Sequence, residues 1–173
     1  CSSYVGMAGG RQEIILELTN LPSGGSLGCF SGQIIHEIGH AVGLYHEQSR
    51  EDRNSHVVIV SGNVQSGKGH NFNQFVSTSF DVGSYDFRSI MHYGCTDFGI
   101  TVNGVTQTTI IPITPPPGVS CTASGMNRIG QRGGLSFHDI GAVNRLYPSN
   151  NGTFNVTNGQ VPNFASWASA SYA

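Results

Sequence analysis

The sequence predicts an α+β fold, because it combines two amphipathic helical segments, two short strand-like segments and long stretches without periodicity. Apolar side chains recur at helical spacing in residues 31–45 and 136–146. Residues 11–19 and 56–60 have the alternation or the β-branched composition of strands. With 173 residues, of which 38% are hydrophobic, the chain is long enough for one domain with a real core.

The two expected strands differ in how clearly the sequence defines them. Residues 56–60 (HVVIV) are a short run of β-branched residues. Residues 11–19 (RQEIILELT) show a two-residue period, and a loop rich in glycine and serine follows them. One face of this first strand carries Ile14, Leu16 and Leu18, and the other carries Glu13, Ile15 and Glu17.

The two expected helices have recognisable ends. Ser31 can cap the first turn of one helix, and Gly43 can end that helix. Ser136 or the preceding Leu135 stands near the start of the other. The apolar positions are Ile34, Ile35, Ile38, Ala41, Val42 and Leu44 in the first helix, and Phe137, Ile140, Val143 and Leu146 in the second.

Composition excludes several classes of function. Charged residues make up 10% of the chain and the net charge is −2, so no basic surface for nucleic acid or anionic membranes is expected. No apolar stretch approaches the roughly 20 residues that a transmembrane helix needs. The chain opens at Cys1 without a methionine or a signal-like segment, so we expect a processed or truncated chain. Residues 149–173 are polar and small, and we expect a tail or linker after a domain of residues 1–148.

The four cysteines indicate an oxidising compartment, and hence a secreted, extracellular protein. An even count leaves three possible disulfide pairings, and four buried thiols are the alternative. None of the cysteines stands in a CxxC pair, so a structural zinc site built on cysteine is not expected.

The chemistry is concentrated in residues 36–46 (HEIGHAVGLYH). His36 and His40 are four residues apart, so their imidazoles project from the same face of a helix and can chelate one ion. His46 supplies a third ligand, because Gly43 can adopt the backbone geometry that turns the chain back. Three neutral histidines with one open position are typical of a catalytic zinc ion.

Glu37 is the expected general base. It stands next to a ligand in the sequence but points to a different side of the helix, where it can reach a water without binding the metal. Zinc lowers the pKa of such a water to about 7, which favours its attack on a peptide carbonyl. A lone HExxH can occur by chance in an amphipathic helix, but the additional glycine and histidine make that explanation hard to sustain.

HExxHxxGxxH followed by a methionine in a tight turn is the metzincin pattern, and the methionine is Met91 in SIMHYG. Within that clan the sequence resembles the astacin family of zinc metalloendopeptidases. Glu47 follows the third histidine, SREDR comes next, and Tyr93 lies two residues after the methionine. CSSYVG at residues 1–6 and IGQRGGLSFHDIGAVNRLY at residues 129–147 extend the resemblance over nearly everything up to Tyr147.

The resemblance implies a metzincin-like fold with a mixed sheet over the active-site helix and an irregular C-terminal subdomain ending in a helix. It also implies that the N-terminal part of the upper subdomain is absent from this chain. The implied partners are protein or peptide substrates, bound along residues 1–6, together with a pro-segment or a missing N-terminal fragment. Because that fragment would contain the mature N-terminus, the role of Glu47 stays open.

The resemblance further implies roles for single residues. Met91 would form a hydrophobic floor beneath the metal. Tyr93 would be a further zinc ligand that leaves the metal and hydrogen-bonds the developing oxyanion, so that it is also catalytic. Cys1 and Cys29 would match a family disulfide, and by elimination Cys95 and Cys121 would then form a pair that holds the long stretch between them.

Two alternatives differ from an active peptidase: a catalytically impaired fragment, and a binding module in which zinc is structural. The presence of Glu37 argues against the second alternative, because a structural site does not need a carboxylate beside the metal. The remaining histidines lack ligand spacing, and we expect none of them to bind the metal: His56, His70, His92 and His138.

Overall fold

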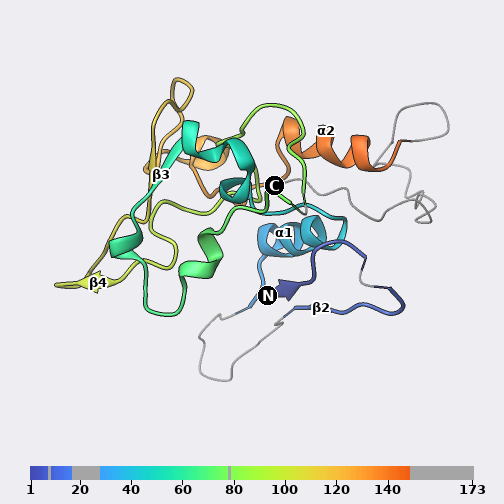
Figure 1. Cartoon of the computed structure of the whole chain (residues 1–173), viewed down its shortest axis with the longest axis horizontal. Helices are drawn as coiled ribbons and strands as arrows, with labels where there is room; N and C mark the ends of the chain where they lie inside the picture. The colour runs from blue at the N-terminus through green and yellow to red at the C-terminus, as the bar shows by residue number, and fades with distance from the viewer. Residues whose placement is uncertain (8, 17–27, 78, 149–173) are drawn as a thin grey trace.

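The computed structural model describes residues 1–7, 9–16, 28–77 and 79–148. Its two α-helices, α1 and α2, lie in one half of the molecule, and strands β3 and β4 lie in the other (Figure 1). Five short 3₁₀ helices connect the described elements. The bounds are Ser2–Ser3 for β1, Ile14–Ile15 for β2, Ser31–Ala41 for α1, Val57–Ile59 for β3, Thr101–Val102 for β4, Val105–Thr106 for β5, Ile110–Pro112 for β6 and Phe137–Leu146 for α2.

The described strands form three antiparallel pairs, β1–β2, β3–β6 and β4–β5. The expected mixed sheet is not seen in this part of the chain, and residues 17–19 of the first expected strand lie outside the described residues. The expected alternation of that strand is also absent from β2, because Ile14 and Ile15 are both exposed. The expected tail, residues 149–173, lies outside the described part as well.

Helix α1 confirms the first expected helix and begins at the expected residue, Ser31, but its N-cap is a different residue. Phe30 occupies the N-cap position and no side chain caps the helix, so the expectation that Ser31 is the cap was wrong. The end of the helix was predicted correctly. Gly43 has a φ of 106°, in the left-handed region that favours glycine, and its N–H donates to the carbonyl of His40.

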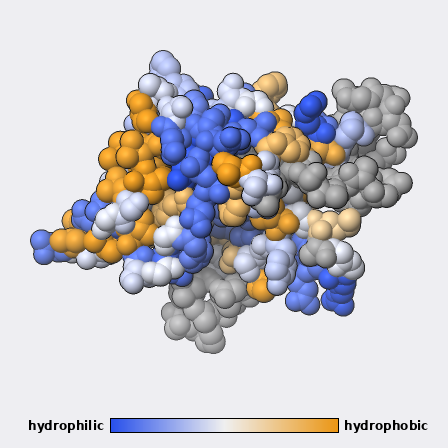
Figure 2. All heavy atoms as spheres, viewed as in Figure 1, coloured by the Kyte–Doolittle hydropathy of each residue, from blue (hydrophilic) through white to orange (hydrophobic). Residues whose placement is uncertain are grey.

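Strand β3 confirms the prediction for residues 56–60. Its partner β6 was not predicted, and the pair buries Val57 and Ile110 while Val58 and Ile111 face outward. Apolar side chains reach the surface on this side of the molecule (Figure 2). The β4–β5 hairpin was also missed, although it turns at an Asn-Gly pair, Asn103 and Gly104, which both have positive φ.

Helix α2 confirms the second expected helix, including its start. The Ser136 side chain accepts a hydrogen bond from the Asp139 N–H and Asp139 accepts from the Ser136 N–H, which forms a capping box. The expected buried face was partly wrong, because Phe137 is 86% exposed and Ile140 is 39% exposed. The face that turns inward carries Asp139, Ala142, Val143 and Leu146.

Two hydrophobic clusters fill the interior. One surrounds the β3–β6 pair and includes Val57, Phe72, Tyr93, Cys95 and Ile110. The other packs the two helices together and includes Leu44, Ile90, Met91, Val143 and Leu146. The segment 89–93 contributes to both clusters, which fixes its position relative to α1.

Both expected disulfides are formed, Cys1–Cys29 and Cys95–Cys121, and the chain has no other cysteine. The second bridge encloses a 26-residue separation that contains β4, β5 and β6, as expected for a bond that holds this stretch. Among the described residues, no helix combines the length and the apolar composition needed to cross a bilayer.

Candidate active site

Three histidines converge at the C-terminal half of α1. His36 and His40 lie one turn apart on the helix, and the turn at Gly43 brings His46 back beside them. Ligand atoms of the three residues all lie within 4.8 Å of one another. The ring centroids of His40 and His46 are 4.5 Å apart. The structure therefore brings together the three histidines that the motif singled out.

The hydrogen bonds of two of these imidazoles leave the same nitrogen available. His36 Nδ1 donates to the carbonyl of Ile90 at 2.8 Å, and His40 Nδ1 donates to the carbonyl of Leu44 at 2.8 Å. Each ring then presents a lone pair at Nε2, and His40 Nε2 lies 3.1 Å from His46 Nε2. A tetrahedral zinc ion with ligands at about 2.0–2.1 Å holds its nitrogens roughly 3.3 Å apart, so the spacing of this pair fits zinc.

Burial keeps the three imidazoles neutral. It lowers the pKa of His36 to about 3, assisted by the positive charge of Arg132. Burial is also the largest cause of the lowered pKa of His40 and of the strongly lowered pKa of His46. A neutral imidazole is the form that binds metal, so at neutral pH the site is in its binding state.

Met91 packs against the helix that carries the ligands. It is fully buried, and a Cβ added to Gly39 would lie 2.6 Å from its sulfur. The Glu47 N–H donates to the Met91 carbonyl at 3.3 Å, which connects the segment after the third histidine to the same turn. Met91 can therefore contact α1 at this point only because residue 39 is a glycine and has no side chain.

Two candidate catalytic residues are neighbours of the histidines: Glu37 follows His36 on α1, and the ring of Tyr93 packs beside His46. Glu37 is buried, and burial raises the pKa of its carboxyl, an effect that the charge of Arg132 opposes. The ring centroid of Tyr93 is 4.3 Å from that of His46. Burial is the main cause that raises the pKa of Tyr93 to about 12, so its hydroxyl keeps its proton at neutral pH.

The backbone of Tyr93 is held from both sides. Its N–H donates to Gln48 Oε1 at 3.0 Å, and its carbonyl accepts from His92 Nδ1 at 2.7 Å. His92 Nε2 accepts from the Tyr85 hydroxyl at 2.7 Å. With both nitrogens occupied, His92 is a structural neighbour of the site, and within the described residues only His36, His40 and His46 form a potential metal group.

Arg132 is a residue of the site that sequence reasoning did not single out. Its Nη1 donates to the carbonyl of His92 at 3.1 Å, and its charge contributes to the lowered pKa of each of the three histidines. Burial lowers its own pKa, while Asp97, Tyr93 and Glu37 raise it. The only sequence signal was its place in the segment 129–147.

Glu47, whose role was left open, is completely buried beside the site. Its Oε1 accepts from the Asp86 N–H at 2.7 Å and lies 3.6 Å from Arg50 Nε. Burial raises its pKa well above the ordinary value, and the charge of Arg50 opposes this. In this structure Glu47 joins the chain after the third histidine to the segment that leads into the methionine turn.

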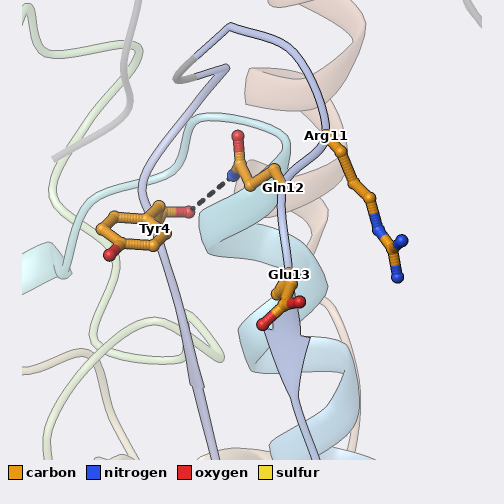
Figure 3. A pocket seen from close by; sticks show the side chains of 4 residues that line it. All are labelled: Tyr4, Arg11, Gln12 and Glu13. Atoms are coloured by element: carbon orange, nitrogen blue, oxygen red, sulfur yellow. Dashed lines mark hydrogen bonds between the residues drawn. The ribbon is translucent and has the colours of Figure 1, made fainter.

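A shallow pocket lies at the β1–β2 pair and is lined by Tyr4, Arg11, Gln12 and Glu13 (Figure 3). Gln12 points toward the opposite segment, and its Nε2 donates to the carbonyls of Tyr4 and Gly6. The Gly6 N–H in turn donates to the carbonyl of His40 at 2.8 Å. This hydrogen bond connects the first segment of the chain directly to the helix that carries the metal ligands.

Comparisons with known proteins find a matching family and relatives over most of this chain. The model of the peptidase family Astacin matches residues 1–148. Protein SpAN of Strongylocentrotus purpuratus is 41% identical over 150 residues, which are 85% of this chain and 21% of that protein. High choriolytic enzyme 1 of Oryzias latipes is 39% identical over 147 residues, covering 85% of this chain and 47% of that protein. Zinc metalloproteinase nas-4 of Caenorhabditis elegans is 37% identical over 151 residues, covering 85% of this chain and 41% of that protein.

The fold is also similar to a solved structure. High choriolytic enzyme 1 of medaka, a hatching enzyme zinc-protease, superposes with a TM-score of 0.64 at 38% identity, over 84% of this chain and 63% of that one. The chain spans less than half the length of the curated relatives just described. Since the family model covers residues 1–148, the chain belongs to the astacin family of peptidases.

Proposed function

We propose that this chain carries the catalytic centre of a secreted, zinc-dependent endopeptidase that cleaves protein or peptide substrates. The observation that carries the proposal is the convergence of His36, His40 and His46, with their ligand atoms within 4.8 Å of one another, in a chain of the astacin family. The family match supports a catalytic domain of residues 1–148, followed by a tail or linker at residues 149–173.

The three histidines would hold one zinc ion, with Tyr93 as an additional ligand through its phenolic oxygen. When bound, zinc supplies Lewis-acid polarisation of a carbonyl and a water of lowered pKa. The lowered pKa values of the three histidines support this assignment, because no proton has to be removed from them before binding at neutral pH.

Glu37 would act as the general base and then as the general acid. Its carboxylate accepts a proton from the attacking water and afterwards donates it to the amine of the cleaved bond. Its buried position and raised pKa support this role, since a base whose pKa moves toward neutrality also returns the proton more readily.

Tyr93 would stabilise the oxyanion. Its hydroxyl remains protonated at neutral pH and lies beside His46, so it can donate a hydrogen bond to a developing negative charge near the ligands. The hydrogen bonds that Gln48 and His92 make to its backbone hold residue 93 beside His46 without using the phenolic hydroxyl.

Extended substrates would bind along residues 1–6. Strand β1 pairs only with β2 among the described strands, and the segment is bonded to α1 through Gly6 and His40. A peptide added to the other edge of β1 would be held through backbone hydrogen bonds close to the metal ligands. The two disulfides support secretion, because such bonds persist in oxidising compartments.

The proposal is tested by cleavage of an unstructured protein such as casein, with zinc content measured in parallel. We expect the wild type to cleave, a zinc chelator to abolish cleavage, and Glu37→Gln to lose about 100-fold or more activity while it keeps its zinc. Glu51→Gln, which changes an exposed carboxylate outside the site, is the matched control and should retain activity. A wild type that binds zinc but cleaves no protein would favour a catalytically impaired fragment or a zinc-stabilised binding module.

A further inference from the structure

The carboxylate of Asp139 lies in the interior between α2 and the methionine turn. It is completely buried, and three groups donate hydrogen bonds to it. Ser89 Oγ donates to Oδ1 at 2.6 Å, while the N–H groups of Ile90 and Ser136 donate to Oδ2 at 2.9 and 2.8 Å. Two of these donors belong to the turn that contains Met91, so the role of Asp139 extends beyond its own helix.

A continuous chain of hydrogen bonds connects this carboxylate to a metal ligand. The Ser89 hydroxyl donates to Asp139 and accepts from the Met91 N–H at 3.0 Å. That N–H belongs to the peptide group between Ile90 and Met91. The carbonyl of the same peptide group accepts from His36 Nδ1 at 2.8 Å.

Each donor in this series of hydrogen bonds points toward the carboxylate of Asp139. The negative charge of Asp139 therefore polarises the Ser89 hydroxyl, then the peptide group, and finally the imidazole of His36. An imidazole whose Nδ1–H donates to a polarised acceptor is held in one tautomer and orientation, and its Nε2 becomes a more basic ligand. The bond from the Ile90 N–H to Asp139 fixes the turn at the residue whose carbonyl His36 contacts.

We infer that Asp139 is a positioning residue for the metal ligand His36, acting through the Ser89 hydroxyl and the Ile90–Met91 peptide. The inference rests on the zinc site of the proposed function. It assigns to a residue near the C-terminal end of the described chain an effect on zinc affinity, although that residue touches neither the metal group nor the candidate base.

Asp139 also belongs to the capping box of α2, and the test has to separate the two roles. Ser136→Ala removes the side-chain acceptor of the Asp139 N–H, which weakens the cap. It keeps the Ser136 backbone N–H and leaves the bonds from Ser89 and Ile90 to Asp139 in place. Ser136→Ala is therefore the matched control for loss of the cap alone.

The experiment measures the zinc dissociation constant by competition with a chelator for the wild type, Asp139→Asn, Ser89→Ala and Ser136→Ala. Asp139→Asn removes the negative charge with little change in side-chain size. Ser89→Ala removes the hydroxyl that links the hydrogen bonds between Asp139 and His36. We expect each to weaken zinc binding about 10-fold, and the double variant to lose little more than either alone. Ser136→Ala should bind zinc within about twofold of the wild type while it lowers the unfolding free energy.

A second readout in the metal-free protein does not depend on zinc binding. The proton resonance of His36 Nδ1–H should move to lower frequency in Asp139→Asn and in Ser89→Ala, because the hydrogen bond to Ile90 weakens, and should stay in place in Ser136→Ala. The inference is overturned if zinc affinity and this resonance are unchanged in the first two variants, or if Ser136→Ala changes them equally. A wild type that binds no zinc would refute the proposed metal site, and the proton resonance would then decide the role of Asp139 by itself.

Discussion

Gly39 and Met91 are in contact at a point where no side chain fits between them: a Cβ built on Gly39 would lie 2.6 Å from Met91 Sδ. Met91 is fully buried, so its sulfur cannot move into solvent to make room. The glycine inside HEIGH therefore lets the methionine turn approach the helix turn that carries both histidines. Gly39 is an unspecified position of HExxH, so packing and not metal chemistry accounts for the glycine here.

Gly39→Ala should lower the free energy of unfolding by about 1–3 kcal/mol, because the added methyl group overpacks a filled interior. Gly141→Ala is the matched control, since it is the same substitution within α2 at a glycine with nothing within 4 Å. It should raise stability by up to about 1 kcal/mol through helix propensity. Denaturant unfolding of both variants checks the prediction, which is contradicted if the two shift stability in the same direction.

Tyr93→Phe should lower kcat by about 100-fold, because it removes one donor to the oxyanion. Three histidines remain, so we expect the zinc content to be unchanged. Tyr45→Phe, a tyrosine that packs against Phe75, should keep its activity. Steady-state kinetics on a fluorogenic peptide separates kcat from KM, and an unchanged kcat in Tyr93→Phe would refute the assigned role.

Loss of the Cys95–Cys121 bridge should cost about 3 kcal/mol of stability, since the bond restricts the unfolded chain. Cys95 is buried in the cluster around β3 and β6, and its carbonyl accepts from the N–H groups of Thr109 and Ile110. Urea unfolding of the Cys95→Ala/Cys121→Ala variant measures the loss. A change below about 1 kcal/mol would show that packing alone holds this stretch.

His92 should make the stability of the metal-free protein depend on pH. Burial lowers its pKa to about 4, whereas an unfolded histidine titrates near 6.5. Between these values the unfolded state binds more protons, so this contribution is fully present above about pH 6.5 and is lost as pH falls toward 4. As pH falls through that window, the free energy of unfolding of the wild type should decrease by roughly 1 kcal/mol more per pH unit than that of His92→Gln. Parallel pH dependences in urea unfolding would contradict the prediction.

Local sequence signals predicted the elements and residues whose geometry is set locally. The four-residue spacing of His36 and His40 on α1, the turn at Gly43 and the start of α2 near Ser136 all depend on neighbours within a few positions, and the structure shows each of them. The Asn-Gly turn at residues 103–104 was equally local. It was missed because the surrounding stretch was interpreted as irregular.

Contacts between distant parts of the chain could not be predicted from one sequence. The inward face of α2 follows from the bonds that Asp139 makes with a turn 49 and 50 residues away, and no helical period reveals such partners. The pairing of β3 with β6 and the approach of Arg132 to the histidines have the same cause. The roles assigned to Met91 and Tyr93 depended on the resemblance to a family, because their spacing carries no signal by itself.

Whether the three histidines form the metal site is decided by the zinc content per chain of the wild type, His46→Ala and His138→Ala after dialysis against metal-free buffer. His46 completes the group of three histidines. His138 lies on α2, where its Nδ1 is near the carboxylate of Asp86, and it does not belong to that group. We expect one zinc per chain in the wild type and in His138→Ala, and a large loss in His46→Ala. Full zinc content in His46→Ala, or none in the wild type, would refute the three-histidine site.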